Sequence, residues 1–170
     1  MFNGGFGQLT AKTVLASEMY SATSGNTEIG CGRSVAIKKV MPGPIKHSVA
    51  VMIFRGDEIL AVRRPDDDEE LPGIWGLPAG TCRGTESIED VIRRIGHDKL
   101  GVTLSPTRKL SSGTQNRTTY RLEMELWEAT MEGIPTHPQW QWSGLDLLNA
   151  GAANGSLCCA LAIKSKSRVS

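Results

Sequence analysis

Apolar runs in the middle of the chain predict β-strands. Residues 48–54, SVAVMIF, and residues 59–64, ILAVRR, are rich in aliphatic side chains and flank a polar turn that contains Gly and Asp. Two such runs around a short turn are typical of a β-hairpin. Residues 122–126, LEMEL, alternate strictly, so Glu123 and Glu125 are expected to point away from the apolar face of a further strand. These two carboxylates could border a ligand cleft or face solvent.

A helical pattern follows the two central strands and a loop. Apolar residues recur at i, i+3, i+4 and i+7, which places them on one stripe of a helix: Ile88, Val91, Ile92 and Ile95. Thr85 or Ser87 can cap the N-terminus of this helix, and Asp90 fits a capping box with Asp in place of Glu. Gly101 is suited to ending it. The pattern therefore predicts a loop and an amphipathic helix, with Ile95 on the buried face.

The loop and the helix share a motif with informative spacing. Gly80, Glu86 and Arg94 follow the spacing G-x5-E-x7-R, and Gly101-Val102 closes the segment. The segment resembles the Nudix box, G-x5-E-x7-R-E-U-x-E-E-x-G-U, in which U is a bulky aliphatic residue. Residues 75–80, WGLPAG, are similar to the sequence that leads into the box in Nudix proteins. The motif and its flank therefore point to this family.

The resemblance extends in family order over residues 46–150, since residues 140–148 are similar to a late tryptophan-containing segment of the family. It implies an α/β fold, a Nudix-type α/β/α sandwich with a mixed β-sheet and the box helix on one side. A C-terminal helix, expected over residues 156–166, would cover the other side. Residues 1–45 are expected to be an N-terminal arm, poorly structured or packed on a partner, and residues 46–170 the Nudix-like domain.

The motif departs from the family where three metal-binding glutamates are expected. Ile95, Asp98 and Lys99 occupy those positions, so their formal charges cancel instead of summing to three negative charges. The i+3 and i+4 spacing would put them on one helical face, which is how one helix gathers carboxylates around Mg²⁺. The resemblance implies Mg²⁺ or Mn²⁺ as the cofactor, with Glu86 and Asp98 as metal ligands and with binding weakened or lost. Residues 66–70, DDDEE, could add a ligand, although such a run is more typical of a solvated loop.

The resemblance also implies a reaction, the hydrolysis of a pyrophosphate bond in a nucleoside diphosphate linked to another group. This hydrolysis would be assisted by a divalent metal and would be weak or use a variant metal site. Glu86, Arg94 and Asp98 are the catalytic candidates. The alternative is a non-catalytic nucleotide-binding or interaction module on the same fold. Arginine and lysine bind phosphates by charge and hydrogen bonds, and tryptophan can stack on a base. The substrate-binding candidates are therefore Arg64, Trp75, Gly80, Arg83 and Lys99.

The composition narrows the cellular setting and the partners. Nineteen basic and eighteen acidic residues leave a net charge of +1, so no charge field recruits nucleic acid or a membrane surface. The 170 residues suit one domain, and the start lacks the apolar segment of a secretory signal. We expect a cytoplasmic protein that binds a nucleotide-type small molecule, with neither nucleic acid nor a membrane as partner and with a homodimer as one option. The four cysteines lack the spacing of a zinc site: Cys31, Cys82, Cys158 and Cys159.

Overall fold

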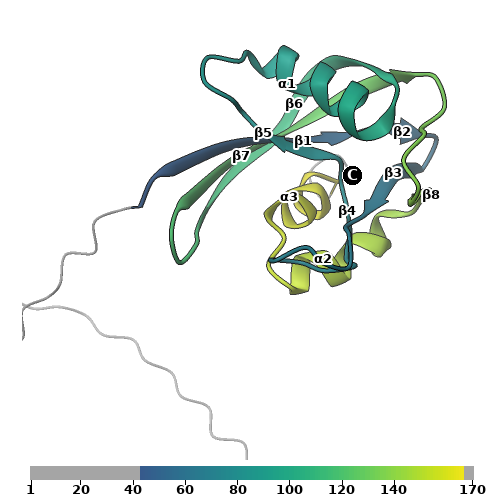
Figure 1. Ribbon diagram of the computed structural model, residues 1–170. Coiled ribbons are helices and arrows are strands. Elements are labelled where there is room, and N and C mark those ends of the chain that lie inside the picture. Colours follow the sequence, from purple (N-terminus) through teal and green to yellow (C-terminus); the bar gives the residue numbers. More distant parts are fainter. Residues whose placement is uncertain (1–42, 167–170) are drawn as a thin grey trace, which may run out of the picture. The chain divides into compact units, whose positions relative to one another are not determined.

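The computed structural model describes residues 43–166, which form two β-sheets with helices packed against them (Figure 1). The predicted N-terminal arm, residues 1–45, falls almost wholly outside the described residues and stays a prediction. The first sheet is mixed: β1 runs parallel to β7, while the other strand pairs of this sheet are antiparallel. Its strand order is β5 (Ala79–Thr81), β1 (Ile45–Met52), β7 (Arg121–Glu132) and β6 (Thr103–Asn116).

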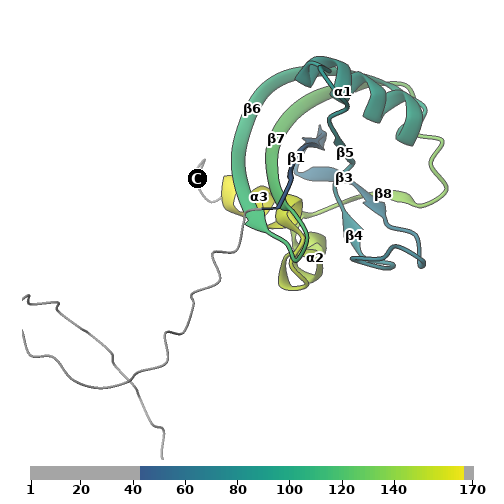
Figure 2. The same ribbon diagram turned by 60° about the vertical axis from the view of Figure 1, so that its left-hand side comes forward.

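The second sheet is smaller and is centred on β3 (Glu58–Arg63), with which its other strands pair antiparallel. These strands are β2 (Phe54–Arg55), β4 (Trp75–Gly76) and β8 (Trp140–Ser143). In the first sheet, β6 and β7 are longer than any strand of the second sheet, and they curve together as one ribbon (Figure 2). The helical segments are α1 (Ile88–Arg94), the π-helix η1 (Ile95–Leu100), the 3₁₀-helix η2 (Leu145–Leu148), α2 (Asn149–Ala153) and α3 (Leu157–Lys166).

Strand β1 lies at the centre of the fold, with its apolar side chains buried on both faces. Val49 and Val51 belong to one hydrophobic cluster together with residues of α1. Ala50 and Met52 belong to a second cluster together with residues of α3. Because side chains alternate along a strand, the box helix and the C-terminal helix cover opposite faces of the first sheet (Figure 1). The predicted α/β/α sandwich with a mixed sheet is confirmed, and so is the C-terminal helix.

The hairpin predicted for residues 48–54 and 59–64 forms only at its tip. Phe54 pairs with Ile59 in β2 and β3, while the residues before Ile53 belong to β1 in the other sheet. The chain crosses between the sheets at Ile53, whose carbonyl accepts a hydrogen bond of 3.0 Å from the Leu60 amide. The prediction was wrong for β1 because a strand buried on both faces gains more from central pairing between two other strands than from a hairpin.

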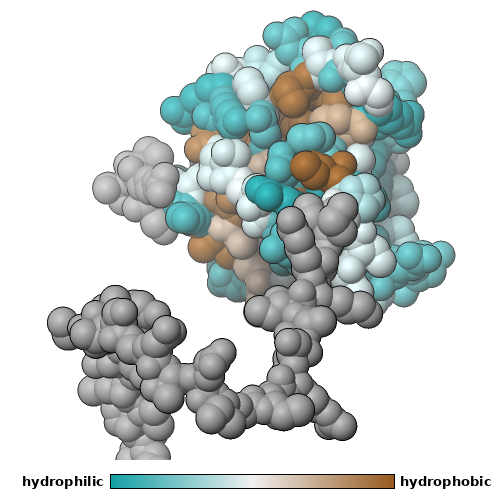
Figure 3. Space-filling view, turned by 90° about the vertical axis from the view of Figure 1, so that its left-hand side faces the viewer, coloured by the Kyte–Doolittle hydropathy of each residue, from teal (hydrophilic) through white to brown (hydrophobic). Residues whose placement is uncertain are grey.

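The surface of the described residues exposes few large apolar side chains. The large exposed apolar side chains there are Ile45, Phe54 and Ile134. On the face shown in Figure 3, apolar patches are separated by hydrophilic side chains. Within residues 43–166, no helix is long and apolar enough to cross a membrane. The suggested homodimer stays a prediction.

Candidate functional site

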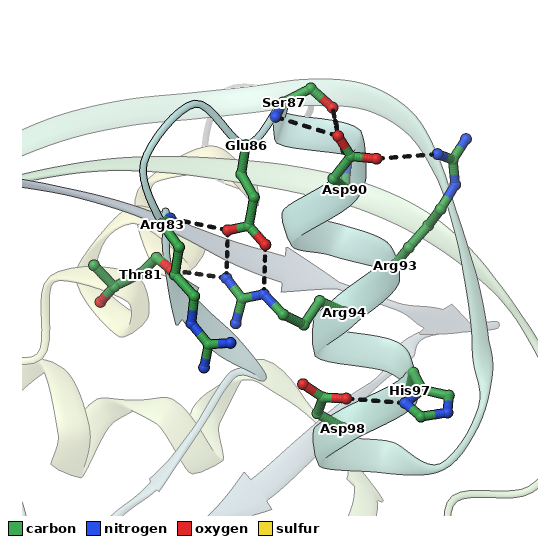
Figure 4. A network of polar contacts seen from close by, with 9 residues as sticks. All are labelled: Thr81, Arg83, Glu86, Ser87, Asp90, Arg93, Arg94, His97 and Asp98. Carbon is green, nitrogen blue, oxygen red and sulfur yellow. Dashed lines mark hydrogen bonds and ion pairs between the residues drawn. The ribbon is translucent and has the colours of Figure 1, made fainter.

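Ser87 begins the helix that carries the motif. Its hydroxyl accepts a hydrogen bond of 3.2 Å from the Asp90 amide, and Asp90 Oδ2 accepts bonds from the Ser87 amide and hydroxyl (Figure 4). The capping box is therefore confirmed, and the structure selects Ser87 over Thr85 as the cap. Because Asp90 is engaged in this cap, its carboxylate is not free to bind a metal ion. Gly101 ends the helical segment with a φ of 69°, as predicted.

Glu86 and Arg94 form a two-pronged ion pair that holds the loop against the helix. Arg94 Nε donates to Glu86 Oε1 at 2.7 Å, and Arg94 Nη2 donates to Glu86 Oε2 at 2.8 Å (Figure 4). The same Nη2 donates to the Thr81 carbonyl at 2.8 Å, and the Arg83 amide donates to Glu86 Oε2 at 2.9 Å. The Arg94 guanidinium and the Arg83 amide lower the pKa of Glu86 to about 2. The arrangement makes Glu86 a fixed anion that positions the loop, and its role as a metal ligand stays a prediction.

The three positions of the missing glutamates differ in burial and in their contacts. Residues 95–100 form a π-helix, whose i→i+5 bonding gives a wider turn than the α-helix assumed from the sequence. Ile95 is 1% exposed and lies in the core beside α1. Asp98 is exposed, and its Oδ1 lies 2.9 Å from Nδ1 of His97 (Figure 4). The predicted burial of Ile95 is confirmed. Ile95 and Lys99 both reach β5, at Gly80 and Ala79, and a face shared with Asp98 stays a prediction.

Lys99 reaches from the π-helix to β5. Its ammonium donates a hydrogen bond of 2.5 Å to the carbonyl of Ala79, the residue directly before Gly80. Partial burial of the ammonium lowers the pKa of Lys99, and the positive charges of Arg64 and Arg94 lower it further. Within residues 43–166, Lys99 forms no ion pair with a carboxylate. Lys99 therefore places a positive charge, beside the paired Arg64 and Arg94, where the family gathers carboxylates.

Two pockets adjoin Lys99, which lines both of them together with Arg64 and Ala79. The first has a volume of about 240 Å³ and also contains Gly80, Thr81 and a surface formed by Lys46, Tyr120, Leu122 and Met124. The second has a volume of about 400 Å³ and also contains Asp68, Asp98 and an apolar wall formed by Val62, Leu77 and Pro78. Of the predicted binding residues, Arg64, Gly80 and Lys99 line a pocket here.

The other two predicted binding residues lie elsewhere. Trp75 is half-buried in β4, and Arg83 is exposed on the loop. Neither residue lines one of these two pockets. Sequence reasoning missed Lys46 and Tyr120, although the Lys46 ammonium lies 4.0 Å from the centre of the Tyr120 ring. Their contact depends on the parallel pairing of β1 with the start of β7, which no local pattern reports.

The carboxylates near the pockets already have partners. Arg64 Nη1 donates to both oxygens of Asp68 at 3.1 Å, and the Leu71 amide donates to Asp68 at 2.8 Å. Burial alone would raise the pKa of Asp68, but the Leu71 amide and Arg64 outweigh it and lower the pKa. Glu70 accepts a hydrogen bond of 2.6 Å from the Tyr120 hydroxyl. The other residues of the acidic run 66–70 are exposed, as expected of a solvated loop, whereas Asp68 is half-buried and anchors the loop.

The donor set does not fit the divalent metal that the family resemblance implies. Mg²⁺ prefers several oxygen ligands, usually carboxylates together with substrate phosphates. In the part of the chain that the structure describes, no three His, Cys, Asp or Glu side chains are placed to hold a metal ion. Glu123 and Glu125 offer no alternative, because Glu123 pairs with His47 and Arg121, and Glu125 pairs with Lys109.

Comparisons with known proteins agree with the motif and the fold. The NUDIX domain model matches residues 44–155. A segment of 68 residues is 31% identical to NAD-capped RNA hydrolase NudC of Stutzerimonas stutzeri (strain A1501), covering 40% of this chain and only 24% of NudC. Among solved structures, the MutT protein from Methanosarcina mazei Go1 aligns with a TM-score of 0.64 and 17% identity over 75% of this chain and 97% of that chain. The E. coli ORF135 protein aligns with a TM-score of 0.62 and 17% identity over 74% of this chain and 94% of that chain.

Proposed function

Because the chain belongs to the Nudix family, we propose that it acts on a nucleoside diphosphate linked to another group and that its hydrolysis of the pyrophosphate bond is slow. The observation that carries this proposal is the pair of pockets that meet at Arg64 and Lys99 beside Gly80. A ligand with a central diphosphate and an organic group at each end suits two pockets with cations at their junction. The intact Glu86–Arg94 pair keeps the loop in place for such a ligand.

The slow rate follows from the groups that remain to activate water. Asp98 lines the larger pocket, and within residues 43–166 its carboxylate is hydrogen-bonded to the exposed His97 alone, so it is the group best placed to accept a proton from attacking water. Asp68 lines the same pocket but is held by Arg64 and the Leu71 amide. A positioned general base contributes about 10²- to 10⁴-fold to a rate, and an exposed, loosely oriented Asp98 would supply only part of that.

One observation favours a second function, a non-catalytic nucleotide-binding module. Lys99 presents a positive charge where hydrolysis in this family relies on metal-bound carboxylates, and its ammonium is held at the Ala79 carbonyl. A lysine can bind a phosphate by charge and hydrogen bonds but does not replace the water-activating role of a metal ion. The two functions share the ligand and differ in turnover.

A release assay separates them. The panel contains dinucleotides, nucleotide sugars, nucleoside triphosphates and an NAD-capped RNA, the last because of the similarity to NudC, each with titrated Mg²⁺ and Mn²⁺. Slow release of a mononucleotide that falls at least about tenfold in Asp98→Asn supports the hydrolase. The matched control is Asp57→Asn, in the turn between β2 and β3, which should leave the rate unchanged. Ligand binding without any release supports the binding module.

A further inference from the structure

The junction of the two pockets contains a lysine, Lys99, that forms no ion pair with a carboxylate of the described residues. The Lys99 ammonium has three donor hydrogens, and one hydrogen bond, to the neutral Ala79 carbonyl, holds it in place. Two donors therefore remain for a ligand. Arg64 also has donors left for a ligand at this junction. Its Nη1 donates to Asp68, whereas its Nε and Nη2 make no hydrogen bond within residues 43–166.

We propose that Lys99 and Arg64 bind the central phosphates of the ligand directly, without a divalent cation. This inference rests on the proposed function, because it assumes a ligand with a diphosphate. In this arrangement the Lys99 ammonium occupies the region where the family places metal-binding carboxylates, and the ligand supplies the negative charge. Charge-assisted hydrogen bonds from lysine and arginine to phosphate oxygens are among the stronger polar contacts in proteins.

The electrostatic surroundings favour an anion over a cation at this point. Arg64 and Arg94 both lower the pKa of Lys99, although each of the two arginines is itself paired with a carboxylate, Arg64 with Asp68 and Arg94 with Glu86. Asp68 offsets part of this charge, but it is bonded to Arg64. A divalent cation would feel twice the repulsion of a single charge, whereas a diphosphate would relieve it. The side chains that fail to suit a divalent cation therefore suit a phosphate group.

The linings on either side of the junction fit organic groups. The smaller pocket is lined by Tyr120, Leu122 and Met124, with the Lys46 ammonium over the Tyr120 ring and the Glu70 carboxylate bonded to the Tyr120 hydroxyl. In the larger pocket, Val62, Leu77 and Pro78 form an apolar wall. The cations stand between these two surfaces. A phosphate bound there would have room for a substituent on each side.

The test is isothermal titration of the full chain with ADP and with inorganic pyrophosphate, first in excess EDTA and then in Mg²⁺. We expect binding in EDTA that weakens as salt is added. In Lys99→Gln, the affinity in EDTA should fall at least about tenfold, the size of one lost charge-assisted hydrogen bond. Arg64→Lys, which keeps a charge for Asp68 but loses the forked donors, should weaken binding as well. Lys166→Gln, at the end of α3 and outside both pockets, is the matched control.

Each outcome bears on the inference separately from the proposed function. Binding in EDTA that depends on Lys99 supports the inference even if the release assay shows no turnover. Binding that requires Mg²⁺ and is unchanged in Lys99→Gln overturns it, while slow hydrolysis would still support the proposed function. Equal loss of affinity in Lys99→Gln and Lys166→Gln would also overturn it, because the effect would then reflect net charge alone. Absence of binding to either ligand under both conditions overturns it too.

Discussion

Ile95 lies directly against Gly80, the first residue of the motif. A Cβ added at position 80 would come within 3.0 Å of Ile95 Cγ1, so β5 approaches the helix closely at this point. The family pattern places a glutamate at position 95, whereas here the side chain fills the core between the helix and β5. The substitution thus converts a metal-binding position into a packing position.

Replacing Ile95 by Glu should strongly destabilise the fold. The side chain is 1% exposed, so its burial contributes about 1.5 to 3 kcal/mol to the free energy of unfolding. The new carboxylate adds a further penalty because it would be buried without a partner. Urea unfolding of Ile95→Glu measures the loss, and Ile134→Glu is the control because Ile134 is 79% exposed. Similar unfolding free energies for the two variants would mean that position 95 can turn toward a pocket.

Two hydroxyls precede the helix, and the structure assigns the capping role to one of them. Ser87→Ala should lower the free energy of unfolding by about 1 kcal/mol, since it removes the side-chain acceptor for the Asp90 amide. Thr85→Ala should change it by less than about 0.5 kcal/mol, because Thr85 is an exposed surface residue outside the cap. Thermal or urea unfolding of both variants is the measurement. A larger loss for Thr85→Ala would contradict the assigned cap.

The sequence predicted the helix because its signals are local. The apolar stripe that includes Val91 and Ile92, the capping residue and the terminal Gly101 all act within a few residues of one another. The π-helical turn after Arg94 has no such signal, since the sequence shows the spacing of side chains but not the width of a turn. The same limit explains Tyr120, which joins the pocket only through strand pairing between distant segments. Of the motif residues predicted to bind a ligand, Gly80 and Lys99 line at least one of the two pockets and Arg83 lines neither, while Tyr120 was missed because its place depends on long-range packing.

Glu86 should make the stability depend on pH in the acid range. Its pKa is lowered from the ordinary value of 4.5 to about 2 by Arg94 first and the Arg83 amide second. Because the pKa is lowered in the folded state, the contribution of the ionised Glu86 carboxylate to the free energy of unfolding is fully present above pH 4.5. This contribution is lost as the pH falls toward 2. We expect the melting temperature of the parent to fall more steeply across this window than that of Glu86→Gln. The difference between the two curves is the measurement, because it removes the effect of the other carboxylates. Parallel curves would mean that the ion pair with Arg94 does not persist in solution.

Lys99→Glu tests whether the motif region can regain a metal ion. The change replaces the positive charge at the junction by a carboxylate next to Asp98, in the pocket that Asp68 also lines. Mg²⁺ favours such oxygen ligands, so the variant should bind Mg²⁺ more tightly than the parent. At a free Mg²⁺ concentration ten times the dissociation constant, linkage would stabilise the fold by about 1.4 kcal/mol, which a thermal melt detects as a rise of a few degrees.

The same variant should lose the binding of ADP in EDTA, because one cation of the phosphate site has become an anion. Lys166→Glu makes the same change of charge away from the two pockets, so it should gain neither property. Ile95 is left in place in this design because its burial makes a glutamate there costly. A variant that folds normally and binds Mg²⁺ no better than the parent would show that residues 98 and 99 do not converge on a cation site. The likeness to the family at these positions would then be limited to the backbone.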